Sequence, residues 1–164
     1  MTTLEFQVRR ISFLSSKPFN NVIERLTAAI GRPDMSVFHR AMLDAACVAE
    51  LEDVVKSAVG SSGLMEFVRF DAGEVLRKER NGAGPKILRL VVGNPIIMKQ
   101  MADTVPDAAA YAPVTILVDE RGDGVHLTYD SMESLIAPYS SRTALLVARD
   151  LDAKVESLLE EAAR

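Results

Sequence analysis

One short segment carries the side chains best suited to bind or transform a small molecule. It reads His126, Leu127, Thr128, Tyr129 and Asp130. If the segment is a strand, its first, third and fifth side chains share one face, because side chains along a strand alternate between the two faces. Two side chains from other predicted strands are expected on this same face, Arg89 and Thr115. Such a face can line a binding cleft in which the imidazole shuttles protons near neutral pH. The alternative is an ordinary solvated sheet face or a polar dimer contact.

A second candidate is Gly93-Asn94-Pro95, where a strand ends in glycine and turns directly into a helix. The N–H groups and the dipole at a helix N-terminus attract anions and polar groups of ligands. We therefore predict a ligand-sized pocket beside Asn94, with His126 or Arg89 on its wall. The alternative is that Asn94 only caps the helix and that Gly93 only relieves a tight turn. The phosphate-loop pattern GxxxxGK[ST] is absent.

Metal and nucleophile chemistry have little support. The imidazole and thiol groups are those of His39, Cys47 and His126, and neither CxxC nor HxxxH occurs. His39 and Cys47 are eight positions apart, which on one continuous helix is about 12 Å, too far for both to bind one ion. The GxSxG motif of serine hydrolases is also absent. We predict no metal site and no cofactor, and we interpret Cys47 as a small buried apolar residue.

The composition is typical of one globular domain, here over residues 1–164. Hydrophobic residues make up 48% of the chain and charged residues 26%. The net charge of −4 argues against a nucleic-acid binder, which needs a basic surface. We find no run of about 20 apolar residues that could span a bilayer, and no secretory signal at the N-terminus. These features predict a cytoplasmic protein with neither nucleic-acid nor membrane partners.

Periodicity predicts the strands and the fold class. Alternating side chains predict strands near 4–13, 64–71, 87–92, 114–119 and 125–130. The alternation changes phase near Arg10, which predicts a bulge or a twist there. With the helices between them, these strands predict a two-layer α+β fold. In that fold a largely antiparallel sheet is backed by helices, and a helical insertion lies at about 32–62.

Helical spacing and turn residues predict the helices. They cover about 19–30, 34–60, 95–101, and the stretch from Ser140 or Ser141 to the C-terminal end. Periodicity leaves open whether 34–60 is one helix capped by Asp34 or two helices broken near Cys47. Asp130 is expected to cap a further short helix, with Glu133 completing a capping box.

Several stretches of the second half occur in a recognisable order. They are Gly63–Asp71, Val92–Pro95, Ala112–Asp119, Val125–Asp130 and Ser134-Leu135. In this order they resemble the bacterial family called domain of unknown function 302, and the resemblance covers about Leu4–Ile30 and Gly63–Ala163. It implies a two-layer fold of the TATA-binding-protein type in the order β-α-β4-α, often a homodimer, and no established reaction. Many members carry a cysteine directly before the Asn-Pro pair. Here Gly93 stands in that place, so no chemistry of that cysteine is carried over.

These observations predict a homodimeric module that binds a polar or anionic small molecule. The predicted ligand-binding residues are Gly93, Asn94, Arg89, His126, Tyr129 and Asp130. One alternative is an enzyme for a small metabolite, with His126 as general acid–base and Asn94 or nearby N–H groups stabilising negative charge. Another is a protein-interaction module whose helices at 35–59 present an apolar face. The sequence leaves catalysis open and favours a binding role.

Overall fold

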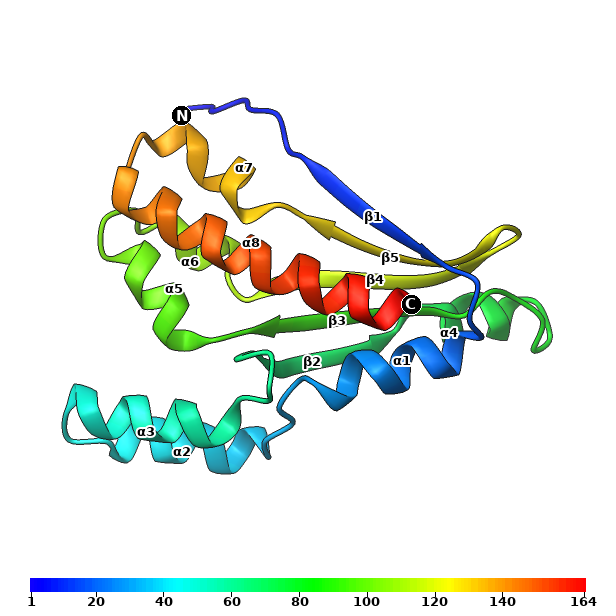
Figure 1. Ribbon diagram of the computed structural model, residues 1–164, viewed down its shortest axis with the longest axis horizontal. Helices are drawn as coiled ribbons and strands as arrows, with labels where there is room; N and C mark the ends of the chain where they lie inside the picture. The colour runs from blue at the N-terminus through cyan, green and yellow to red at the C-terminus, as the bar shows by residue number, and fades with distance from the viewer.

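Five strands form one antiparallel sheet in the computed structural model, which describes residues 1–164 (Figure 1). The strands are β1 (Arg10–Ser15), β2 (Met65–Asp71), β3 (Ile87–Gly93), β4 (Val114–Arg121) and β5 (Gly124–Asp130). They lie side by side in the order β1-β5-β4-β3-β2, and every neighbouring pair is antiparallel. The predicted two-layer α+β fold is confirmed.

Three helices cover one face of the sheet (Figure 1). They are α1 (Phe19–Ala28), α5 (Pro95–Ala102) and α8 (Arg142–Ala163). The last of them crosses the sheet as predicted, and its buried side chains recur every three or four residues, which places them on one side of the helix. The shorter helices are α4 (Ala72–Glu79), α6 (Ala108–Tyr111), α7 (Met132–Ile136) and a 3-10 turn at Ala137–Tyr139. None of the helices combines the length and the apolarity needed to cross a bilayer.

Alternation along β5 decides which residues enter the core. Val125, Leu127 and Tyr129 face the helices and are buried, as the sequence predicts. Their neighbours His126 and Asp130 point to the opposite face and are half-buried. That opposite face also carries exposed apolar side chains, namely Leu14, Val68 and Phe70. The fold therefore buries one side of its sheet and leaves the other open to ligands or partners.

β1 is shorter than the sequence predicts, because it begins at Arg10 and not near residue 4. Arg10 pairs with Asp130, the last residue of β5, so residues before Arg10 have no strand to pair with. Leu4 and Val8 are exposed accordingly. Of the bulge or twist predicted near Arg10, the bulge is wrong, since the register of β1 against β5 is continuous from Arg10 to Ser15. The irregularity of this sheet lies in β2, between Glu66 and Val68.

Ser131 caps α7, and the prediction that Asp130 does so is wrong. The Ser131 side chain accepts a hydrogen bond from the Ser134 N–H. Asp130 still belongs to β5, and its carboxylate binds the guanidinium of Arg10 instead. The local pattern allowed either residue as the cap, because both side chains can accept from the first turn of a helix.

The insertion contains two helices, α2 (Met35–Asp44) and α3 (Val48–Ala58), separated by a short break. Asp34 caps α2 through two backbone N–H groups, as predicted. Cys47 lies in the break and is exposed, so its predicted burial is wrong. A residue between two helices does not share the apolar face of either. The helical spacing of apolar residues continues across 34–60, so the sequence pattern did not reveal the break.

The two chain segments that connect the insertion to the sheet layer cross at Gly31 and Gly60. A side chain on Gly31 would collide with the carbonyl oxygen of Ala58, and one on Gly60 would collide with that of Ala29. Both glycine N–H groups donate to the same acceptor, the carbonyl oxygen of Leu64, at 2.9 and 3.0 Å. The two chain segments therefore touch through their backbones, which only glycine permits.

We predict that Gly60→Ala destabilises the fold, because the new methyl group forces the two segments apart. The expected loss is about 3 kcal/mol in the free energy of unfolding, measured by urea denaturation. The control is Gly122→Ala, since no atom lies within 4 Å of a side chain built at Gly122. Equal stability of the two variants would contradict the crossing as described.

Candidate functional site

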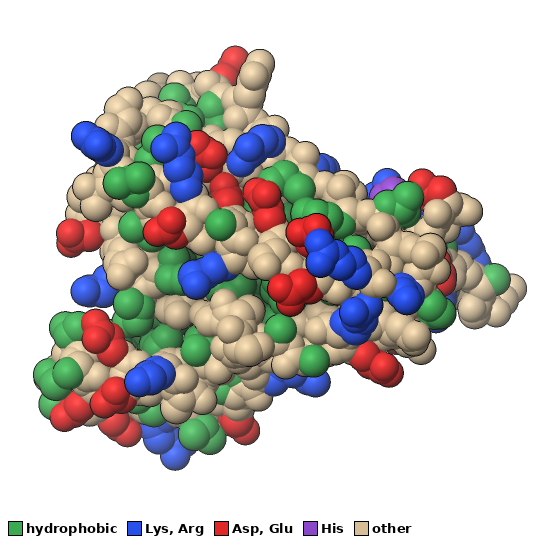
Figure 2. All heavy atoms as spheres, viewed as in Figure 1, with side chains coloured by type: hydrophobic (Ala, Val, Ile, Leu, Met, Phe, Trp, Pro, Cys, Tyr) green, Lys and Arg blue, Asp and Glu red, His purple; other side chains and the backbone are tan.

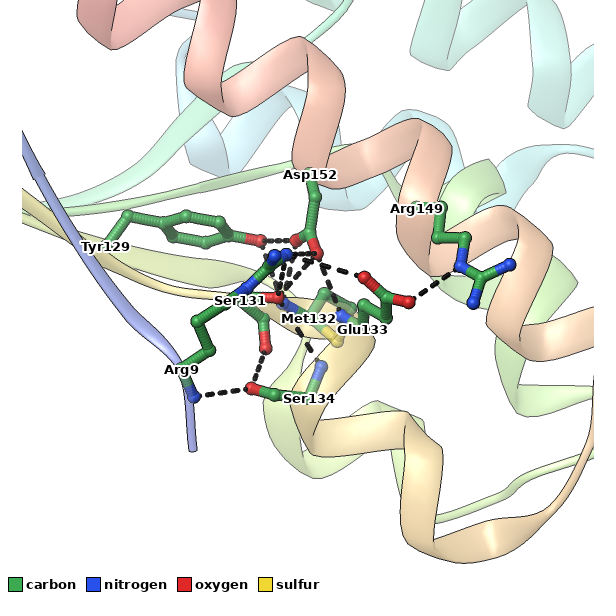
Figure 3. Close-up of polar contacts among 8 residues, drawn as sticks. All are labelled: Arg9, Tyr129, Ser131, Met132, Glu133, Ser134, Arg149 and Asp152. Atoms are coloured by element: carbon green, nitrogen blue, oxygen red, sulfur yellow. Dashed lines mark hydrogen bonds and ion pairs between the residues drawn. The ribbon is translucent and has the colours of Figure 1, made fainter. Parts of the chain in front are cut away.

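A buried carboxylate joins three parts of the fold (Figure 3). Asp152 projects from α8 and is only 3% exposed. It accepts hydrogen bonds from the Tyr129 hydroxyl at 2.5 Å, the Ser131 hydroxyl at 2.7 Å, the Met132 N–H at 2.7 Å and the Glu133 N–H at 3.0 Å. These donors satisfy both oxygens of the buried carboxylate. Asp152 thereby holds the end of β5 and the start of α7 against α8.

Two arginines extend this cluster to the surface (Figure 3). Arg9 Nη2 lies 3.4 Å from Glu133 Oε2 and 3.9 Å from Asp152 Oδ2. Arg149 Nε donates to the other Glu133 oxygen at 2.7 Å. The segment before β1 is fastened to α7 and α8 through these contacts. Both guanidiniums are more than half exposed, so solvent screening limits what the ion pairs add to stability.

The buried polar groups of the Asp152 cluster all have partners within the protein. Burial, followed by the nearby Asp152 charge, raises the pKa of Tyr129 well above its usual value, so the phenol stays a neutral donor. No buried side-chain nitrogen or oxygen of the chain lacks a partner. The Tyr129 hydroxyl, which the sequence places among the ligand-binding groups, is thus already used by Asp152.

A hollow of about 330 Å³ opens on the uncovered side of the sheet, where β4 begins and β5 ends. We call it the sheet-face groove. It is lined by Arg10, Tyr111, Val114, Thr115, Leu117, Thr128, Tyr129, Asp130 and Leu135. The predicted polar face is therefore partly assembled here, because two threonines and Asp130 surround one cavity. Its volume lies at the lower end of the range for small-molecule sites.

Arg10 and Asp130 form a two-pronged ion pair on the groove wall. Arg10 Nε lies 2.7 Å from Asp130 Oδ1, and Nη2 lies 2.8 Å from Oδ2. The hydrogen bond from Arg10 lowers the pKa of Asp130 below its usual value, so the pair stays ionised at neutral pH. The two charges compensate each other, and the pair itself adds no net charge to the groove.

Arg89 supplies the uncompensated charge next to the groove. Its Nη2 donates to Thr115 Oγ1 at 3.3 Å, and it forms no ion pair with a carboxylate. The residue is exposed, and this is the one side-chain hydrogen bond that Arg89 makes within the protein. An unpaired guanidinium beside threonine hydroxyls is a suitable partner for a carboxylate or phosphate group.

His126 lies outside this groove, at the hairpin end of β5. Its Nε2 is 2.9 Å from Asp123 Oδ1, and this contact lowers the pKa of Asp123. Asp119 lies opposite His126 in the sheet and binds Arg121 instead. The structure therefore does not bring His126 together with Arg89 or Asp130 around one cavity. No group of three or more His, Cys, Asp or Glu side chains lies close enough to hold a metal ion.

Asn94 caps α5 as predicted, and both polar atoms of its amide have partners within the protein. Oδ1 accepts from the N–H groups of Ile96 and Ile97 at 2.9 and 3.4 Å. Nδ2 donates to the Gly63 carbonyl oxygen at 3.0 Å. The next N–H, that of Met98, is bound to the Asn94 carbonyl oxygen. Since the remaining first-turn residue is proline, this N-terminus has no free donor for an anion.

A pocket does open beside Asn94, but its walls differ from the predicted ones. This seam pocket, of about 180 Å³, is lined by Phe38, His39, Met42, Phe67, Asn94, Pro95, Met98, Ala112 and Pro113. Neither His126 nor Arg89 reaches it. Gly93 adjoins it, and a side chain there would press on Pro113, 2.9 Å away. The pocket is apolar, and so it does not match the polar site that the sequence predicts.

Sequence reasoning missed two residues that organise these sites. Arg10 was expected at an irregularity in a strand, and its partner lies 120 positions away. Asp152 lies among the core-facing residues of α8, four positions after Ala148 and three before Val155. A single charged residue on an apolar helix face was the available signal, because buried carboxylates require partners.

Comparison with known proteins agrees with the fold. The family model described as "Domain of unknown function DUF302" matches residues 43–162. The match therefore includes α3 of the insertion and leaves out 4–30, which the sequence resemblance contained. A crystal structure of an uncharacterized conserved DUF302 protein from Bacillus stearothermophilus is similar, with a TM-score of 0.64 and 14% identity. It covers 94% of this chain and 98% of that chain. At this identity the likeness shows the fold alone. No curated protein matches the chain.

We predict that Asp152→Asn destabilises the protein, because the new NH₂ group faces donors where the second carboxylate oxygen accepted. The expected loss is about 3 kcal/mol in the free energy of unfolding, measured by urea denaturation. Asp150→Asn on the same helix is the control, since Asp150 is exposed and makes no ion pair. A variant of Asp152 as stable as the control would show that the cluster is dispensable.

Proposed function

The chain belongs to the DUF302 family, whose description assigns no function, and for it we propose the role of a homodimeric module that binds a small anionic molecule in the sheet-face groove. The observation that carries this proposal is the unpaired guanidinium of Arg89 beside Thr115, at the edge of a cavity of about 330 Å³. Around this cavity, Arg89 is the cation without a carboxylate partner. A ligand with a carboxylate or phosphate group would supply one.

The rest of the groove suits the remainder of such a ligand. The hydroxyls of Thr115 and Thr128 can donate and accept hydrogen bonds, while Leu117 and the ring of Tyr111 offer apolar contact. The Tyr111 hydroxyl is held by that of Tyr139 at 2.7 Å, which fixes this wall. We propose a compact molecule with one anionic group, some hydroxyl or carbonyl oxygens, and a small apolar body.

No specific observation favours catalysis. His126, the general acid–base of the enzyme alternative, lies outside the groove and binds Asp123 of the hairpin. Asn94, the second group of that alternative, lies at the seam pocket with both amide atoms engaged. The binding role needs only the groove and the unpaired guanidinium of Arg89, and the geometry supports this role better than catalysis.

Exposed apolar residues on the insertion support the homodimer. Leu43 is 86% exposed, and Val37 and Val48 are more than half exposed. Hydrophobic side chains gather at the end of the hairpin formed by α2 and α3 (Figure 2). Apolar groups exposed together favour association, because contact removes them from water. We propose that two copies pair through these helices, which is also how the interaction alternative would act.

The ligand proposal predicts that Arg89→Gln loses binding and keeps stability. The wild-type protein is screened by thermal shift against small carboxylates and phosphates, and each hit is titrated calorimetrically. We expect Arg89→Gln to weaken binding at least about tenfold, since a charge-assisted hydrogen bond is lost. Arg40→Gln, which changes an exposed and unpaired arginine on α2, should bind like the wild type. Hits that bind both variants equally well would contradict the groove as the site.

The dimer proposal predicts a change of mass in Leu43→Lys. Light scattering should give the wild-type protein twice the 17.9 kDa of one chain and the variant one chain, because a buried lysine in an apolar contact is unfavourable. Leu146→Lys on α8 is the control, since Leu146 is another exposed leucine and lies outside the insertion, and this variant should stay dimeric. A monomeric wild type would contradict the proposed dimer. A dimeric Leu43→Lys variant would show that the two copies pair through another surface.

A further inference from the structure

The seam pocket is a second cavity, independent of the proposed groove. It lies between the insertion and the sheet layer, and its walls come from α2, β2, the start of α5 and the connector before β4. The pocket separates two groups of buried apolar residues, the main core and a smaller cluster that includes Phe38. It is therefore a gap left where two separately packed bodies meet.

The chemistry of the walls is almost wholly apolar. The lining includes two aromatic rings and two thioethers, those of Phe38, Phe67, Met42 and Met98. Asn94 also reaches the pocket, but its amide hydrogen bonds are already made. Water inside would find few partners, whereas sulfur and aromatic carbon make favourable contacts with an aromatic ring.

One polar group remains at the edge of the pocket. His39 is exposed, its imidazole makes no hydrogen bond within the protein, and its ring packs against Phe38 with 6.2 Å between the ring centroids. An imidazole with a free nitrogen can donate to or accept from a hydroxyl group at this edge. The arrangement distinguishes an inner apolar end of the pocket from a polar edge.

The walls are held in place from both sides. The insertion is pinned at its base by the backbone bonds of Gly31 and Gly60 to Leu64. On the other wall, Pro95 begins α5 and Pro113 precedes β4, and proline leaves the backbone little freedom. A pocket with fixed walls loses little entropy when it is filled.

We propose that the seam pocket binds a small aromatic molecule, with its ring between Met42 and Met98 and one hydroxyl group at His39. The volume supports a single ring, since a cavity of about 150 Å³ lined by apolar side chains is known to take up benzene. The termini of this chain are not the occupant. The segment before β1 is bound to α7 through the backbone N–H of Arg9. At the other end of the chain, the carbonyl oxygen of Ala163 accepts a hydrogen bond from the hydroxyl of Ser15 in β1.

Methionine methyl groups report on the occupant directly. The chain has seven methionines, and two of them line the pocket. In spectra of the 164-residue chain with labelled methionine methyls, phenol should shift the Met42 and Met98 signals through its ring current and leave the other five unchanged. At a concentration about tenfold above its Kd, phenol should also raise the Tm by about 4 °C. Shifts at all seven methionines, or at none, would overturn the proposal.

Three variants test the assignment. Met42→Trp fills the pocket and should abolish the phenol response at Met98, while Val75→Trp, an exposed site on α4, should keep it. His39→Leu should bind benzene as the wild type does and lose the preference for phenol over benzene. A full Met98 response in Met42→Trp, or an unchanged phenol preference in His39→Leu, contradicts the site. If Met98, which lies on α5 and away from the proposed dimer contact, shifts on dilution without phenol, a second copy occupies the pocket and the proposal is wrong.

Discussion

Burial of a single face of the sheet is the constraint on which the rest of this molecule depends. The strands alternate, so every apolar residue that packs under α1, α5 and α8 has a neighbour that points the other way. Those neighbours form the open face, and this is where charged side chains can remain hydrated. The ion pair of Arg10 and Asp130 and the free guanidinium of Arg89 are consequences of this arrangement.

The same constraint explains the buried polar cluster. When the chain leaves β5 it turns inward, and the first N–H groups of α7 are then covered by α8. Such groups need acceptors, because an unpaired buried N–H is costly. Asp152 supplies them from the covering helix and also accepts from Tyr129. The charged Asp152 on the apolar face of α8 is thus needed because α8 covers the N–H groups that begin α7.

The sequence predicted those features that depend on neighbours along the chain. The positions of β2 to β5, the caps at Asp34 and Asn94, and the face occupied by each residue of β5 follow from local patterns, and the structure agrees with them. Periodicity gives the face of a residue but not its distance along the sheet. His126 and Asp130 share a face but lie at opposite ends of β5, so only one of them reaches the groove.

The two cavities differ in chemistry because they arise differently. The sheet-face groove is a hollow in a solvated surface, and so its walls carry charge. The seam pocket is a gap between two apolar clusters, and so its walls carry rings and thioethers. At Asn94 the side-chain oxygen that caps α5 is used by the backbone itself, as it accepts from the N–H groups of Ile96 and Ile97.

The contact between Gly31 and Gly60 makes the insertion a modular unit. Because the chain leaves and rejoins the body at one point, the path of the strands on either side does not depend on what lies between. A segment with adjoining ends can be lengthened, shortened or exchanged between related chains without repositioning the sheet. The part of the molecule that carries Phe38, His39 and Met42 can therefore evolve separately from the part that carries Arg89. An exchange of the insertion would thus change the apolar pocket and leave the sheet-face groove in place.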